Sequence, residues 1–184
     1  MGLQTAAGVP LQLVVGGLRR ERAAMDPSAR VRILSHWQAV NASTGQLFNF
    51  QDALPEGFVY DTEPACRALV TARQLDEQSV WPLLQLIQQA FYTEGRDVTH
   101  AKVLVELAER AGIPRIEFVA AFDSQAMQSA TEVDFNWVQD LGIAGFPTLL
   151  AERRGQLALL TNGYQPLQAL APLLGRWLEQ AAHA

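Results

Sequence analysis

The first apolar run of the chain, residues 11–15, is short, aliphatic and rich in β-branched residues. Two glycines end it, and an apolar run bounded by turn residues predicts a β-strand. The residues before it end at Gly8-Val9-Pro10 and are typical of the last turn of a helix. We therefore expect a helix end and then one strand before the first polar loop.

The middle of the chain, residues 26–140, has apolar residues three or four positions apart, which is the spacing of amphipathic helices. The first helix begins at the capping pair Asp26-Pro27 and ends at Gly45. An aromatic loop without a clear period follows at 46–60. The remaining spacing predicts helices at about 63–73, 79–94, 99–111, 114–123 and 124–140.

Beyond Pro147 the pattern changes to two short apolar runs. Residues 148–152 and 156–161 predict two strands joined by a turn at Arg153-Arg154-Gly155. The apolar face of a terminal helix must then cover the sheet, and it carries Leu167, Leu170, Leu173, Leu174, Trp177 and Leu178. Strands near both ends with helices between them indicate the α/β class with a large helical insertion.

The composition fits one globular core of ordinary size. The chain has 184 residues, of which 49% are hydrophobic and 18% charged, and its net charge of -5 is spread evenly. This balance argues against a nucleic-acid partner, and no segment is apolar enough to span a membrane. Because no basic region precedes residues 11–15, we expect a strand there and not a signal peptide.

The single cysteine, Cys66, excludes an intrachain disulfide, a Cys-x-x-Cys motif and a cysteine-rich metal site. We expect Cys66 to be a small core residue, as helix-borne cysteines among alanines and leucines usually are. Such sparing use of cysteine indicates the cytoplasm. Glu94, Arg96 and Asp97 have side chains suited to acid–base work, but charges around a helix end are more often solvated.

The three histidines, His36, His100 and His183, lie far apart in the sequence and have no carboxylate at ligand spacing. We therefore expect no metal site, and we expect His100 and His183 to be exposed. Nothing in the sequence calls for a cofactor.

Four stretches at matching spacing together resemble one protein family. They are His36-Trp37, residues 61–68, residues 91–97 and Gly145-Phe146-Pro147-Thr148. All four are similar to members of the DsbA-like family of thioredoxin-fold proteins, most closely to its FrnE-like branch. The resemblance implies a thiol-disulfide oxidoreductase or protein disulfide isomerase. It also implies a thioredoxin-like domain made of residues 1–25 and 141–184, with residues 26–140 as an inserted helical domain.

The resemblance further implies a substrate site. Gly145, Phe146, Pro147 and Thr148 would form a loop with a cis Phe146-Pro147 bond, and its backbone edge would bind an extended peptide or protein thiol. His36 and Trp37 would line the same groove, although a histidine on a helix surface needs no such role.

The front of the chain departs from the family. Members open with a strand and a Cys-x-x-Cys motif at the start of the first helix, and this sequence has only the end of that helix. Without these thiols the chain cannot run a dithiol-disulfide cycle. We expect these 184 residues to be inactive, either because a natural N-terminal segment lies outside this sequence or because the chain is a degenerate member, and we favour the first.

Two other functions stay open. A glutathione-dependent transferase or isomerase of the kappa type shares the inserted-helix plan and uses a serine in place of the first cysteine. A non-enzymatic module would hold extended peptides at the Phe146-Pro147 edge. The reading frame upstream of Met1 discriminates, since Cys-x-x-Cys supports the oxidoreductase, a lone serine the transferase, and no continuation the binding module.

The family's first strand lies between the strands that match residues 11–15 and 148–152. Its lack would leave two open sheet edges. The chain can pair residues 11–15 directly with residues 148–152, borrow a strand from a second copy, or hold an upstream segment that is not represented here. If the sequence is complete, we expect a homodimer formed through these edges, with the contact near Leu13, Val15, Leu149 and Ala151.

Overall fold

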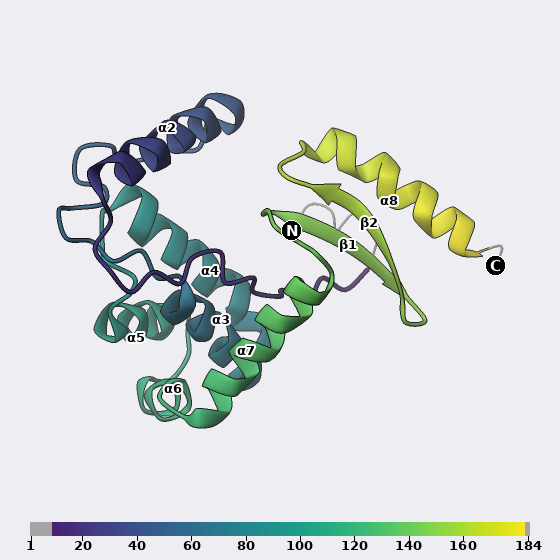
Figure 1. Ribbon diagram of the computed structural model, residues 1–184. Helices are drawn as coiled ribbons and strands as arrows, with labels where there is room; N and C mark the ends of the chain where they lie inside the picture. The colour runs from purple at the N-terminus through teal and green to yellow at the C-terminus, as the bar shows by residue number, and fades with distance from the viewer. Residues whose placement is uncertain (1–8, 183–184) are drawn as a thin grey trace. The chain divides into compact units, whose positions relative to one another are not determined.

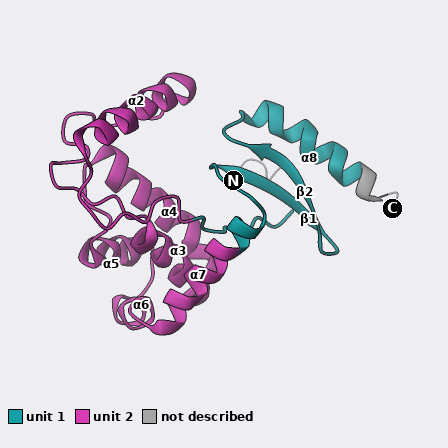
Figure 2. Cartoon of the chain, in the orientation of Figure 1, with its two compact units in different colours: residues 1–16, 137–184 teal, residues 17–136 magenta. Residues whose placement is uncertain are grey.

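The computed structural model describes residues 9–182 of the chain (Figure 1). The chain divides into two compact units, one of residues 1–16 and 137–184 and one of residues 17–136 (Figure 2). The helix end expected before Pro10 and the histidine at position 183 lie outside the described residues.

The larger unit, residues 17–136, consists of helices and loops with one isolated bridge between Arg20 and Asp61. Every helix predicted for the middle of the chain is present. The elements are α2 (Pro27–Thr44), α3 (Glu63–Leu75), η1 (Glu77–Ser79), α4 (Val80–Gln88), η2 (Gln89–Thr93), α5 (Ala101–Arg110), α6 (Arg115–Phe122) and most of α7 (Gln125–Asp140).

Local signals set both ends of α2. The Asp26 carboxylate accepts a hydrogen bond from the Ala29 N–H at 2.9 Å, and Pro27 occupies the first turn. Gly45 ends the helix in the left-handed conformation, with φ 71°, which costs a glycine little. These are the residues from which the helix was predicted, and its bounds are confirmed.

An aromatic cluster joins α2 to the loop at 46–60 and to η2, a single π-helical turn that extends α4. The Trp37 ring lies at the centre, with centroid distances of 5.4 Å to Phe48, 5.5 Å to Phe91 and 5.0 Å to Tyr92. Packed with them are Met25, Ile33, Leu34, Phe50, Ala53, Leu54, Phe58 and Tyr60. Residues 46–60 form no helix or strand, as predicted, and aromatic packing holds this loop in place of a backbone ladder.

The smaller unit contains an antiparallel hairpin of β1 (Thr148–Arg153) and β2 (Gln156–Asn162), followed by α8 (Leu167–Ala182). Arg154 and Gly155 have φ of 53° and 79°, and two positive φ values define the tight turn that matches strand twist. A bulge interrupts the register between Leu149 and Leu150. α8 contacts both strands, with Leu174 buried and Leu167 45% exposed, so the predicted apolar face covers the hairpin in part.

The strand predicted at 11–15 is not formed. These residues have no regular secondary structure, and within the described residues the sheet contains β1 and β2 alone. β-branched residues favour an extended backbone, but a strand exists only where a neighbouring strand completes the ladder. The α/β class with a helical insertion is confirmed, while this first strand is a correction.

Replacing Phe118 by Ala should lower the free energy of unfolding by about 3–5 kcal/mol, because it leaves a cavity where a ring was packed. Phe118 has an exposed fraction of 0%, and its ring stacks on Phe122 at 5.5 Å. Ile116, on the same helix, is 85% exposed, so Ile116→Ala should change stability by less than about 0.5 kcal/mol. Urea unfolding of both variants measures the difference, and equal losses would contradict this packing.

Candidate functional site

Of the residues expected to bind substrate, Gly145, Phe146 and Pro147 lie in the loop between α7 and β1, and Thr148 begins β1, all within the smaller unit (Figure 2). α7 ends where Gly142 takes the left-handed conformation and the Ile143 N–H donates to the Val138 carbonyl at 3.1 Å. The loop contains a cis peptide bond between Phe146 and Pro147. β1 begins with the next residue, so the loop leads directly into the hairpin.

Three hydrogen bonds tie this loop to itself and to the end of β2. The Thr148 hydroxyl oxygen lies 2.8 Å from the Gly145 carbonyl oxygen and 3.2 Å from Oδ1 of Asn162, and it donates its one proton to these acceptors. The Gly163 N–H donates to the Pro147 carbonyl at 2.7 Å. The carbonyls on both sides of Phe146 are therefore engaged within the loop.

The backbone groups of Phe146 differ from those of Gly145 and Pro147 in their hydrogen bonding. Neither the N–H nor the carbonyl of Phe146 is hydrogen-bonded to any of the residues that the structure describes. Phe146 as a whole residue is 41% exposed and Pro147 is exposed too, so solvent reaches this part of the loop. A donor and an acceptor on one exposed residue can pair with an extended chain as a neighbouring strand would.

His36 and Trp37 lie next to each other on α2, in the larger unit. His36 is exposed, whereas Trp37 is only 4% exposed and belongs to the aromatic cluster. The structure thus gives Trp37 a packing role, and the expected role of both residues in lining a groove stays a prediction.

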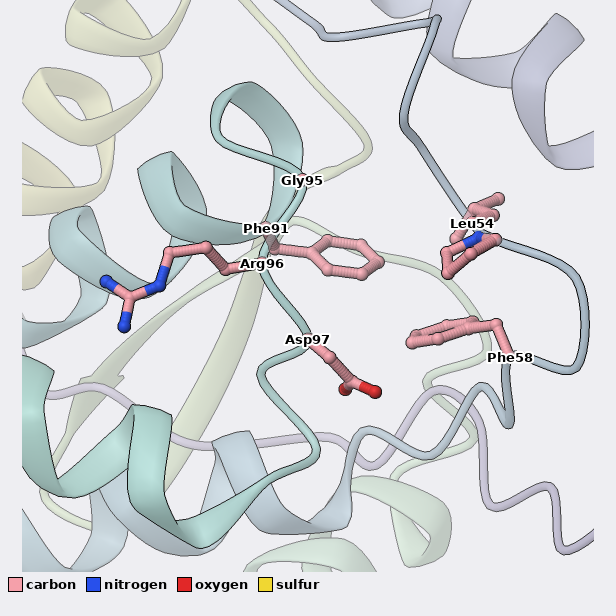
Figure 3. A pocket seen from close by; sticks show the side chains of 7 residues that line it. Leu54, Phe58, Phe91, Gly95, Arg96 and Asp97 are labelled. Carbon is pink, nitrogen blue, oxygen red and sulfur yellow. The ribbon is translucent and has the colours of Figure 1, made fainter.

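A shallow pocket opens beside the aromatic cluster (Figure 3). It encloses about 240 Å³, part of it open to solvent, and its lining is Leu54, Pro55, Phe58, Phe91, Gly95, Arg96 and Asp97. In Figure 3 the side chains of Leu54, Phe58 and Phe91 converge, while that of Arg96 extends away from them. The space is therefore lined mainly by apolar groups.

The charged residues at this pocket already have partners. The Arg96 guanidinium donates two hydrogen bonds to Glu106, at 2.7 and 3.2 Å, and holds the pKa of that carboxyl below its ordinary value. One Asp97 oxygen accepts from the Thr99 N–H at 2.8 Å and from its hydroxyl at 2.6 Å. Glu94 lies 3.9 Å from Arg96. These pairs stabilise the chain after η2, and none presents a free acid or base to the pocket.

Cys66 lies on α3. Part of its surface still reaches solvent, yet burial of the sulfur raises the pKa of the thiol to about 11. The nearby carboxylates of Glu63, Asp61 and Asp134 act in the same direction. The backbone of Gly17 acts to lower the pKa of the thiol. At neutral pH the thiolate, which is the nucleophile, is scarce.

The described residues contain no cluster of three His, Cys, Asp or Glu side chains able to hold a metal ion. Between residues 9 and 182, no helix has the length and apolar character needed to cross a membrane.

Comparison with known proteins gave matches to one protein family. The family model for the DSBA-like thioredoxin domain matches residues 12–175. Among solved structures, a protein from Nitrosomonas europaea that is proposed to be a protein disulfide isomerase has a TM-score of 0.84 and 42% identity, with 90% of this chain and 79% of that chain covered. The comparison with curated proteins gave no match.

The cytosolic disulfide reductase DsbM from Pseudomonas aeruginosa is a more distant structural neighbour. It has a TM-score of 0.73 and 27% identity, with 97% of this chain and 87% of that chain covered. A second DsbM structure, solved with GSH, has a TM-score of 0.71 and 26% identity over the same shares of the two chains.

Two residues that shape the loop were missed by the sequence analysis. Asn162 and Gly163 were not among the predicted site residues, yet both hold the loop from the end of β2. The Asn-Gly pair was the available signal, since it marks a turn and Gly163 has φ 101°. Its place opposite Pro147 follows only from the hairpin register.

Alkylation of Cys66 by iodoacetamide should be slow at neutral pH in the folded chain and fast in denaturant. The rate of the folded chain should rise tenfold per pH unit until the pH nears about 11, because only the thiolate reacts. Mass spectrometry of samples quenched at successive times gives the rate. A plateau near the pKa of a free thiol, about 8.5, would contradict the burial described here.

Proposed function

Because the chain belongs to the DSBA-like thioredoxin domain family, whose model matches residues 12–175, we propose that the loop at Gly145–Thr148 binds the thiol substrate of a disulfide exchange reaction. The fold and family expected from the sequence are confirmed by this match and by the 42% identical neighbour. The binding role of the loop is the proposal, and it rests on Phe146, an exposed residue whose backbone N–H and carbonyl have no hydrogen-bond partner among the described residues.

The substrate class follows from the geometry of this edge. A peptide that runs antiparallel to the chain at Phe146 can donate a hydrogen bond from one N–H to the Phe146 carbonyl. The carbonyl of the same peptide residue can accept a hydrogen bond from the Phe146 N–H, which gives the hydrogen-bonded pair of an antiparallel ladder. The exposed Phe146 ring offers an apolar contact beside that pair. We expect an extended peptide segment that carries a cysteine, with backbone bonds giving affinity and little demand on sequence.

The chemical step needs thiols that this chain does not supply. In disulfide exchange a thiolate attacks one sulfur of a disulfide, the other sulfur leaves as a thiolate, and a second thiol resolves the mixed disulfide. These 184 residues have one cysteine, and burial keeps Cys66 protonated at neutral pH. We propose that they bind the substrate and do not themselves run the dithiol cycle.

Glutathione is a second candidate ligand. The DsbM neighbour was solved with GSH, and this favours a glutathione-dependent role over a peptide module without thiol chemistry. The kappa-type transferase or isomerase is the enzyme class to which such a role would correspond. Glutathione is short, so it would engage fewer backbone groups of the loop than an extended peptide.

We further propose membership of the FrnE-like branch and a cytoplasmic location. The four family-like stretches, including Gly145-Phe146-Pro147-Thr148, support the branch. The single cysteine and the likeness to a reductase described as cytosolic support the location.

A peptide with a central S-methylcysteine, labelled with fluorescein, should bind the 184-residue chain without covalent exchange. Methylating the one peptide nitrogen that pairs with the Phe146 carbonyl should weaken binding about two- to tenfold, the worth of one net hydrogen bond. Methylation of the adjacent nitrogen, which points away from the edge, is the control. Fluorescence anisotropy measures both affinities, and equal affinities for the two methylated peptides would refute pairing at this edge.

The chain should reduce insulin no faster than its Cys66→Ala variant, because a single thiol cannot resolve a mixed disulfide. Turbidity of precipitating insulin, with dithiothreitol as reductant, measures the rate. Activity of the wild-type chain above that of the variant would show that Cys66 does take part.

Self-association through the sheet is also proposed. β1 pairs with β2 on one side, and no strand of the described residues pairs with its other side. Light scattering should therefore give the mass of a dimer. A monomer mass across the accessible concentration range would rule this out.

A further inference from the structure

The residue that follows the 9–15 segment, Gly16, lies against the tip of the Phe146 ring within the smaller unit. A Cβ added at Gly16 would lie 1.9 Å from Cζ, 2.2 Å from Cε1 and 3.0 Å from Cε2 of Phe146. Real side chains do not approach so closely. The ring therefore occupies the space that any other residue at position 16 would need for its first side-chain atom.

Gly16 is needed because there is no space for a side chain, and not because its backbone conformation requires glycine. Gly16 is absent from the glycines with positive φ among the described residues, so other residues could adopt its backbone. Gly17 differs, because its φ of 56° favours glycine whatever surrounds it. At position 16, therefore, the ring of Phe146, and not the backbone conformation, is what requires a glycine.

The same ring belongs to the residue whose backbone edge is proposed to bind substrate. Phe146 is 41% exposed as a residue, and the ring atoms that lie against Gly16 are the outermost ones, Cζ and the two Cε atoms. A larger residue at 16 would thus move the ring to another position while leaving the hairpin and its hydrogen bonds in place. Side chains away from their preferred rotamers are less favourable and less well ordered.

Resting on the proposed function, we infer that Gly16 is a positioning residue for substrate binding. It lets the Phe146 ring lie against the backbone of residue 16, which orders Phe146 before the substrate arrives. A preordered residue loses less conformational freedom on binding. Any side chain at position 16 displaces the ring and so weakens the capture of an extended thiol peptide.

The test is a double-mutant cycle with the S-methylcysteine peptide as probe. Gly16→Ala should weaken binding about two- to tenfold, as expected for a side chain forced from its rotamer. Phe146→Leu removes Cζ and both Cε atoms, so Gly16→Ala should have no further effect in that background. Gly175→Ala is the matched control, since a Cβ there meets nothing within 4 Å.

Two further measurements keep the outcomes separate. Thermal unfolding should show that Gly16→Ala is folded, and the chemical shift of the Gly16 amide should lose its ring-current contribution in Phe146→Leu. Wild-type binding with an unchanged affinity of Gly16→Ala, or an equal effect of Gly16→Ala in both backgrounds, overturns this inference alone. Absence of peptide binding by the wild-type chain overturns the proposed function and the inference with it.

Discussion

The hydrogen bond from the Gly163 N–H to the Pro147 carbonyl is the contact on which the candidate site depends. At 2.7 Å it links the start of β1 to the residue after β2, and the Thr148 hydroxyl adds a second tie to Gly145. These bonds engage the carbonyls on either side of Phe146 and leave its own N–H and carbonyl unpaired among the described residues. Hairpin pairing thus determines which backbone groups are offered to a ligand.

Most of the helical insertion could be predicted because its signals are local. The cap at Asp26 and the left-handed Gly45 each act within one turn of the helix that they end. Whether residues 11–15 form a strand could not be predicted from local signals, since a strand needs a partner far away in the sequence. The π-helical turn at Gln89–Thr93 likewise depends on how Phe91 and Tyr92 pack against Trp37.

The candidate site was likewise predictable only where its residues are neighbours in the sequence. Gly145, Phe146, Pro147 and Thr148 are adjacent, so a sequence motif could identify them together. Gly163 and Gly16 act on the loop through space, and neither contact follows from spacing.

The described part of the larger unit contributes packing more than chemistry. Cys66 is held protonated, Arg96 and Asp97 are engaged in ion pairs and hydrogen bonds, and Trp37 is buried.

Exchange of backbone amide hydrogens tests most directly the claim that the loop offers Phe146 to a substrate. In the free chain the Phe146 N–H should exchange rapidly and the Gly163 N–H slowly, and the peptide should protect Phe146. A Phe146 N–H that is protected without peptide, or that stays unprotected when the peptide is bound, would contradict the account.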